Sequence, residues 1–354
     1  MTPELRLRLE FTRGTGRGSG PASHRAEQSG AHRYHARMSD AEVMTVTGRL
    51  PASRLGVVDA HDHLFMRSPA LAGDEFEDLA LSTAEAIDGR ASGLGAIVDM
   101  TPIGLGRRPD LLRAVSESTG VPIIAATGYH RDAHYPDGHW VYAASVEMLA
   151  ERVVRDLEVG MDPNDWTDPT AGPDPARAGV IKAGASYHHV SEAERRRLEA
   201  AAVGSRRAGV SILVHAEIGT FGHEIVSLLE EGGVPPHRII LAHMDRNPDA
   251  ELHAEIAARG VSLEYDTMGR TKYRPDSELL DLVEAMVGAG HVGRLLLGQD
   301  LGRRSSLRAY GGGPGMRYLM ETFVPRLKRR IGHEAVQKIL VANPARAFAL
   351  ESTA

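Results

Sequence analysis

Short apolar runs alternate with longer amphipathic stretches along most of this 354-residue chain, and this alternation limits its fold more than any other feature. Each run is rich in β-branched residues and has the length of a buried strand, whereas the stretches between the runs show helical spacing. Strands that alternate with helices form parallel sheets. We find eight such runs: Gly56–Ala60, Gly95–Thr101, Val121–Thr127, Gly179–Ala183, Val210–His215, Arg238–His243, Val261–Asp266 and Arg294–Asp300.

Two of the intervening stretches carry clear helix signals. Ser191 and Glu194 form a capping-box pattern at the start of Ser191–Ala208, and apolar residues recur at helical spacing over Ser277–Ala289. Eight strand–helix units predict an α/β protein, a (β/α)8 TIM barrel. An open doubly wound sheet is the alternative, but it normally has a glycine-rich phosphate turn after its first strand, and here that turn reads His-Asp-His. We therefore favour the barrel.

The first 37 residues differ in composition from the rest of the chain. They contain seven Arg and three acidic residues among Gly, Ser and His, without apolar periodicity. This composition predicts that residues 1–37 are a disordered or non-native N-terminal extension, with Met38 and Met44 as alternative starts. We assign residues 45–352 to a single TIM-barrel domain.

Composition excludes several classes of site and partner. The chain has no Cys, which excludes disulfides, thiolate metal sites and a cysteine nucleophile, so any metal must be held by His, carboxylate or a modified side chain. A net charge of −6 gives no general attraction to nucleic acid or anionic lipid. No run approaches the roughly 18 apolar residues of a membrane span. We therefore expect a cytoplasmic protein with a small-molecule partner, and neither nucleic acid nor membrane.

Metal-binding residue types lie at the carboxyl ends of five of the predicted strands. In a TIM barrel these ends converge on one face, so residues distant in sequence meet in one cavity. A single His at a strand end is more often a hydrogen-bonded loop residue, but here His61 and His63 leave one strand on the same side, where both can bind one ion. Lys182 lies within a buried strand, where Lys is rarely found unpaired. The predicted metal site is His61, His63, Lys182, His215, His243 and Asp300. We assign the other histidines to the surface, including His188, His189, His237, His253 and His333.

The local motifs around these residues are Gly179-Val180-Ile181-Lys182, Val214-His215-Ala216 and Leu241-Ala242-His243-Met244-Asp245. With them, the chain from Thr45 to Arg346 resembles the phosphotriesterase-related branch of the amidohydrolase superfamily. The resemblance implies a binuclear metal centre at the carboxyl ends of the barrel strands, in which His61 and His63 bind the more buried ion. It further implies that His215 and His243 bind the more exposed ion. Lys182, carbamylated to N6-carboxylysine, would bridge the two ions, and Asp300 would bind the buried ion and accept a proton.

The implied cofactors are two divalent ions, with Zn²⁺ as the default and Mn²⁺, Co²⁺ or Fe²⁺ as alternatives. An unmodified Lys182 ammonium would repel a cation, whereas its carbamate can bridge two ions about 3.5–4 Å apart. Two ions that share a water lower its pKa, so the predicted reaction is hydrolysis of an ester bond by a metal-bridging hydroxide. Asp300 is the predicted catalytic residue, which passes the proton of the water to the leaving group.

Cationic loops indicate the class of substrate. Residues 266–274 and 301–313, which follow the seventh and eighth strands, contain six cationic residues, and these loops commonly bind phosphate in barrels. A solvated basic surface is the alternative. The loop after the eighth strand also resembles that of family members that open phosphorylated sugar lactones, as well as that of members whose substrate is unknown. His130 stands where many related lactonases have a Tyr near the scissile ester. The predicted substrate-binding residues are Tyr129, His130, Lys272, Arg303, Arg304 and Arg308.

These observations predict a binuclear metal-dependent hydrolase that opens a small phosphorylated sugar lactone. One alternative is an acyl-homoserine lactonase or promiscuous phosphotriesterase with the same fold, and another is a non-catalytic metal-containing binding protein. The chain has only two Trp, too few for a large aryl-triester pocket, and an acyl chain would need an apolar channel where the sequence has Arg. A purely structural metal site would not need an open pair of ions. Barrels of this branch often pair, so we expect a homodimer.

Overall fold

The structure is a computed structural model that describes residues 41–163 and 173–351. These residues fall in one compact unit, Ser39–Ala354. The predicted N-terminal extension, residues 1–37, lies outside the described residues.

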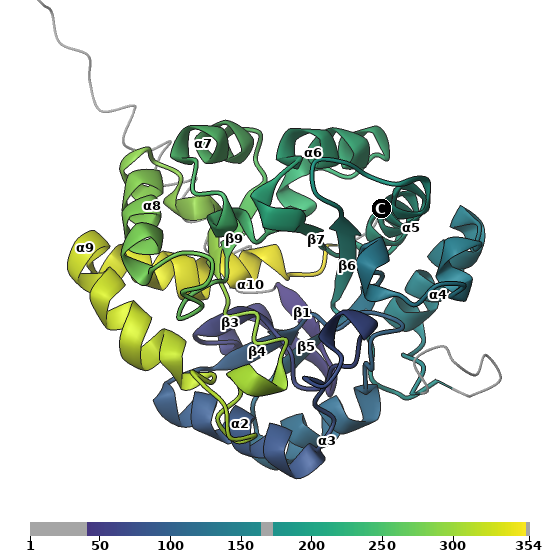
Figure 1. The fold of residues 1–354 in the computed structure, drawn as a ribbon, viewed down its shortest axis with the longest axis horizontal. Helices are drawn as coiled ribbons and strands as arrows, with labels where there is room; N and C mark the ends of the chain where they lie inside the picture. Colours follow the sequence, from purple (N-terminus) through teal and green to yellow (C-terminus); the bar gives the residue numbers. More distant parts are fainter. Residues whose placement is uncertain (1–40, 164–172, 352–354) are drawn as a thin grey trace, which may run out of the picture. The chain divides into compact units, whose positions relative to one another are not determined.

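Eight parallel strands form one sheet, and their order in the sheet follows their order in the chain. Helices surround these strands (Figure 1). Each strand overlaps one of the eight predicted runs, which confirms the predicted (β/α)8 barrel. The strands are β3 (Val58–Asp62), β4 (Ala96–Asp99), β5 (Ile123–Gly128), β6 (Val180–Ala185), β7 (Ile212–Ala216), β8 (Ile239–Ala242), β9 (Ser262–Tyr265) and β10 (Leu295–Leu297).

The helices lie outside the sheet, and most of them bury apolar side chains. At the start of α5, the Glu194 N–H donates to Ser191 Oγ at 3.0 Å and the Ser191 N–H donates to Glu194 Oε2 at 3.1 Å, so the predicted capping box is present. Both predicted helices are confirmed within one residue at each end. The helices are α2 (Leu79–Ser92), α3 (Pro109–Thr119), α4 (Val146–Glu158), α5 (Glu192–Ala208), α6 (Gly222–Glu231), α7 (Ala250–Ala258), α8 (Asp276–Gly288), α9 (Val324–Gln337) and α10 (Asn343–Ala347).

An antiparallel hairpin, β1 (Glu42–Thr45) and β2 (Gly48–Pro51), precedes the barrel. This hairpin has no counterpart among the predicted strands, and the predicted domain start at residue 45 falls at the end of β1. The N–H of Val46 donates to the carbonyl of Ile123 at 2.9 Å, at the amino end of β5. The hairpin therefore covers the amino end of the barrel and leaves the carboxyl end open.

His253 was expected at the surface, but it lies buried on the inner side of α7, where its Nδ1 is 2.8 Å from the Tyr265 hydroxyl. A histidine on the buried face of a helix is accommodated because this hydroxyl supplies a hydrogen-bond partner. Among the described residues, no helix combines the length and apolar character that a membrane crossing needs.

The barrel closes between β10 and β3. The backbone N–H groups of Gln299 and Asp300 both donate to the carbonyl oxygen of His61, at 3.0 and 2.8 Å. Gly298 lies so close to β3 that a Cβ atom at this position would be 2.7 Å from both the backbone nitrogen and the Cβ of His61. This close approach requires glycine, and it places Asp300 next to His61.

We expect Gly298→Ala to lower the free energy of unfolding by about 1–3 kcal/mol, because the added methyl group overpacks a rigid backbone. Urea denaturation would measure the change. Gly288→Ala is the matched control, since a Cβ at Gly288, at the end of α8, meets nothing within 4 Å. Equal losses of stability in both variants would contradict this account of the closure.

Candidate metal centre

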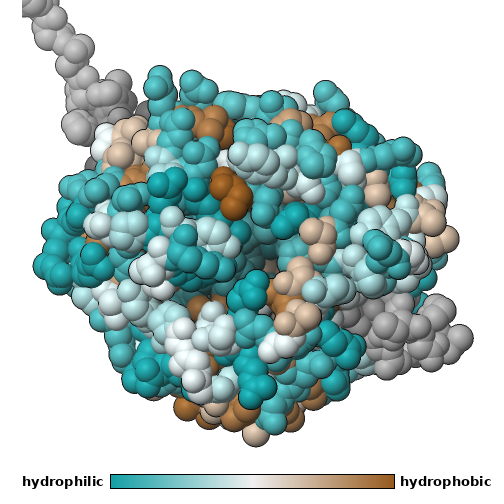
Figure 2. Space-filling model, viewed as in Figure 1, coloured by the Kyte–Doolittle hydropathy of each residue, from teal (hydrophilic) through white to brown (hydrophobic). Residues whose placement is uncertain are grey.

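A cavity of about 210 Å³ opens at the carboxyl end of the barrel. Figure 2 shows a hollow near the middle of this face, surrounded mainly by hydrophilic residues. The volume is smaller than the roughly 300–1,000 Å³ of sites that bind drug-sized ligands, so the cavity suits a small polar molecule. All the predicted metal-site residues line it, namely His61, His63, Lys182, His215, His243 and Asp300.

His61 and His63 both turn their Nε2 atoms toward Asp300. The Nδ1 of His61 lies 2.8 Å from Glu264 Oε2, and the Nδ1 of His63 lies 2.8 Å from Thr101 Oγ1. The Nε2 atoms of His61 and His63 lie 3.7 and 3.4 Å from Asp300 Oδ1. Two donor atoms that share a tetrahedral ion about 2.1 Å from each are themselves about 3.4 Å apart. These three side chains therefore have the spacing of ligands to one ion.

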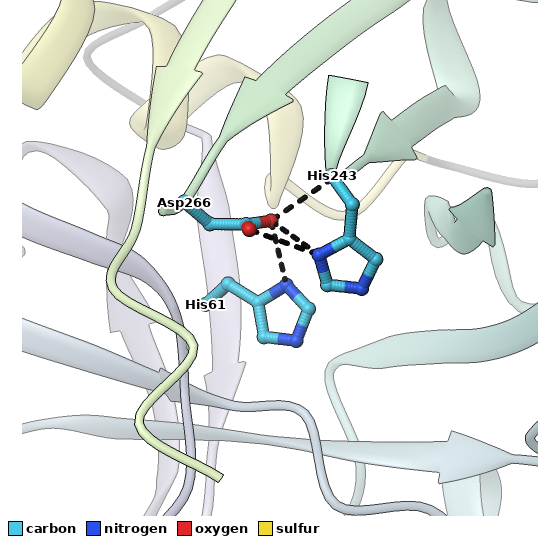
Figure 3. A group of neighbouring side chains, drawn as sticks. All are labelled: His61, His243 and Asp266. Carbon is cyan, nitrogen blue, oxygen red and sulfur yellow. Dashed lines mark hydrogen bonds and ion pairs between the residues drawn. The ribbon is translucent and has the colours of Figure 1, made fainter. Parts of the chain in front are cut away.

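Asp266 holds His243 from the side away from the cavity. Its carboxylate oxygens lie 2.8 and 2.9 Å from His243 Nδ1, and one also accepts from the His243 N–H at 3.0 Å. Figure 3 shows that His243 and His61 each turn one ring nitrogen toward Asp266 and the other away from it. A carboxylate in this position fixes the tautomer of a metal-binding histidine, which leaves Nε2 as the ligand atom. The carboxylate of Asp266 also lies within 4.8 Å of ring nitrogens of both His61 and His243, but its bonds to His243 Nδ1 suit a role in orienting that ring.

Lys182 and His215 complete the group. The Nζ of Lys182 is buried 3.2 Å from His61 Nε2, and burial lowers the pKa of this lysine to about 8. A lowered pKa increases the fraction of Lys182 in the neutral amine form, which is the form that can react with carbon dioxide.

The ring of His215 lies 4.3 Å from that of His243, and the Nε2 of His215 is 2.6 Å from Glu217 Oε2. The geometry brings together side chains from β3, β6, β7 and the ends of β8 and β10.

The protonation states of the group suit a cation. Burial lowers the pKa of His61, His215 and His243 well below the usual 6.5, because an imidazolium loses its hydration there. Neutral imidazole is the form that binds metals. Burial alone would raise the pKa of Asp300, but the Arg270 guanidinium holds this pKa well below its usual range. Neutral nitrogens beside an ionised carboxylate are a donor set that fits Zn²⁺ and similar divalent ions.

A cationic wall stands directly beside Asp300. Arg246 donates to Asp300 Oδ2 at 2.7 Å, and Arg270 donates to the same oxygen and, at 2.9 Å, to the Asp300 carbonyl. The two guanidinium carbons lie 4.6 and 5.0 Å from the centre of the Tyr273 ring. Packing against one ring keeps both guanidinium groups in place, so the cavity presents fixed positive charge next to the candidate metal centre.

The structure brings two of the predicted substrate-binding residues, His130 and Arg303, to the cavity. The placement of Tyr129 differs from the prediction. Its side chain is buried in the core against Trp140, and its hydroxyl donates to the Leu149 carbonyl at 3.1 Å. Tyr129 and His130 point to different sides because neighbouring residues diverge at the end of a strand.

The other three predicted cations also lie outside the cavity lining. Lys272 and Arg304 are exposed, and Arg308 pairs with Asp88 at 3.4 Å. Arg270, from the same loop as Lys272, lines the cavity instead. Loops have no regular spacing of side chains, so charge composition could identify the loops but not the residues within them.

Several cavity residues were missed by the sequence analysis. They are Arg131, His134, Glu217, Arg246, Arg270 and Tyr273 in the lining, and Glu264 and Asp266 behind the histidines. The sequence does contain a signal for Glu264 and Asp266. Glu264 and Asp266 are two residues apart on an apolar strand, so their side chains point to the same face.

Comparisons with known proteins find one family over most of the chain. A model of the phosphotriesterase family matches residues 41–348. A phospho-furanose lactonase from Mycoplasmopsis synoviae is 32% identical over 324 residues, which cover 87% of this chain and 91% of the relative. The crystal structure of a lactonase from Listeria monocytogenes has a TM-score of 0.80 at 26% identity, covering 88% of this chain and 100% of that chain. The phosphotriesterase homology protein from Escherichia coli, solved with phosphate in its active site, has a TM-score of 0.75 at 30% identity. The match covers 83% of this chain and 99% of that chain.

Proposed function

The chain belongs to the phosphotriesterase family and is a hydrolase of ester bonds, and from this premise we propose that it opens a small phosphorylated sugar lactone. The observation that carries the proposal is the cationic wall of Arg246, Arg270 and Tyr273 in a cavity of about 210 Å³. Fixed guanidinium forks and a hydroxyl suit a phosphate dianion, which accepts several hydrogen bonds at once. The phosphate in the active site of the Escherichia coli relative supports the same class of ligand.

We infer the residues that would hold two divalent ions from the family resemblance together with the geometry. His61, His63 and Asp300, whose ligand atoms lie within 4.8 Å of one another, would hold one ion. His215 and His243, whose rings lie 4.3 Å apart, would hold the other, with a carbamylated Lys182 between them. When bound, two such ions would supply a water of lowered pKa and a positive charge for the carbonyl oxygen of the ester. Zn²⁺ is the default, and Mn²⁺, Co²⁺ or Fe²⁺ suit the same donors.

Asp300 and His130 would handle protons and hydrogen bonds at the ester. Asp300 is ionised and faces the cavity, so it can take the proton of the attacking water and pass it to the departing ring oxygen. His130 accepts the backbone N–H of Arg131 at its Nδ1, at 2.8 Å. The proton of the neutral His130 ring therefore lies on Nε2, where it can donate to the substrate.

The alternative substrates fit the cavity less well. Its aliphatic lining is confined to Met66, Ala70 and Leu71. A long acyl chain or an aryl triester would need a larger apolar surface than these three side chains provide. The cavity therefore favours a compact, charged lactone over an acyl-homoserine lactone or a phosphotriester.

The test is hydrolysis of paired lactones that differ only in a terminal phosphate, with enzyme reconstituted with divalent metal. We expect kcat/KM to be roughly 100- to 1,000-fold higher for the phosphorylated lactone, which is about 3–4 kcal/mol of transition-state binding. Inorganic phosphate should inhibit competitively. Equal turnover of both lactones would contradict the phosphate site, and no turnover of any lactone by protein that retains two ions would overturn the substrate class.

A further inference from the structure

We propose that Glu264 is a positioning residue of the metal centre, which holds His61 in the orientation and tautomer that bind the more buried ion. The inference rests on the metal centre described under the proposed function. It adds a residue on β9 that is not itself a ligand and that acts through His61.

The placement of Glu264 is unusual for an acidic residue. It lies in the interior of the barrel with none of its surface exposed, and its Oε2 is 2.8 Å from His61 Nδ1. Its other oxygen, Oε1, has no hydrogen-bond partner among the described residues. Burying a carboxylate is unfavourable unless a strong partner compensates for its lost hydration. Burial raises the pKa of Glu264 well above its usual value, and one imidazole N–H offsets this only in part, so an ionised Glu264 needs positive charge nearby.

A metal ion bound at Nε2, on the side of the His61 ring opposite Glu264, would supply this positive charge. A ring that donates from Nδ1 to Glu264 carries its lone pair on Nε2, which lies 3.2 Å from Lys182 Nζ and 3.7 Å from Asp300 Oδ1. A carboxylate on Nδ1 makes Nε2 a better electron donor and keeps the ring from rotating. Glu264 would therefore strengthen binding of the buried ion through the ring between them.

The test compares Glu264→Gln with the wild-type protein, because Gln keeps the size of the side chain and can still accept from Nδ1 but has no charge. We expect its affinity for Zn²⁺, titrated against a chromophoric chelator, to fall by about 10- to 100-fold at the tighter site. The Co²⁺-substituted protein should show an altered visible spectrum. The thermal midpoint of the metal-free variant should equal or exceed that of the metal-free wild type. Glu264→Asp, which keeps the charge, should recover part of the affinity.

Glu255→Gln is the matched control, since this side chain on α7 is 61% exposed and pairs with His223 at the surface. It should leave the affinity and the spectrum unchanged. Wild-type metal affinity in Glu264→Gln would overturn the inference, and so would a metal-free Glu264→Gln protein that is destabilised or unfolded, because the role would then be structural. Wild-type protein that binds no divalent ion would overturn the metal centre itself. Wild-type protein that binds two ions but opens no lactone would overturn only the proposed substrate.

Discussion

Asp300→Asn is expected to lower kcat/KM for the lactone by roughly 1,000- to 10,000-fold. The amide keeps the shape of the side chain, but it carries no charge for an ion and cannot accept a proton, and positioned proton transfer alone is worth about 100- to 10,000-fold. In the structure Asp300 is the carboxylate toward which the Nε2 atoms of His61 and His63 converge. Steady-state kinetics on protein of measured metal content would give the value.

Metal analysis separates the two contributions of Asp300. If the variant retains both ions, the loss of rate is assigned to proton transfer, whereas loss of one ion assigns it to ligation. Asp281→Asn is the control, because this acidic side chain on α8 is 67% exposed and remote from the cavity. A variant at Asp300 that kept more than a tenth of the wild-type kcat/KM would contradict both roles.

The fold could be predicted from sequence because the signals that define it are local. Each apolar run marks a strand by itself, and eight strand–helix units have one favoured way to close. The candidate metal residues could be predicted for a related reason. His61 lies near the end of β3, Lys182 lies within β6 and Asp300 follows β10, and the topology of a barrel gathers the carboxyl halves of its strands whatever their separation in sequence.

The residues that could not be predicted depend on distances across the barrel. Glu264 reaches His61 from β9 to β3, although β10 lies between these strands in the sheet. No spacing within β9 indicates which strand its side chain will meet. The substrate-binding residues of the loops could not be predicted for another reason. Arg270 lines the cavity, whereas Lys272, two residues later, is exposed. Only the path of the loop in space decides between them.

Arg270→Ala is the variant that tests this distinction, and we expect it to remove most of the preference for a phosphorylated lactone. The ratio of kcat/KM for the phosphorylated to the unphosphorylated lactone should fall by roughly 100-fold, because a guanidinium fork makes charge-assisted bonds to phosphate that alanine cannot replace. The ratio is the appropriate measure, since Arg270 also contacts Asp300 and its loss will slow both substrates.

Arg304→Ala is the matched control, because the charge pattern of the sequence predicts that Arg304 binds substrate and the structure predicts that it does not. Arg304 lies in the loop after the eighth barrel strand and was predicted to bind substrate, but it is exposed and does not line the cavity. Its removal should change the ratio less than about twofold, because an exposed charge is screened by solvent and salt. If Arg304→Ala lost the preference for phosphate and Arg270→Ala kept it, the phosphate would bind at the outer loop, and the wall beside Asp300 would serve only to hold that carboxylate ionised.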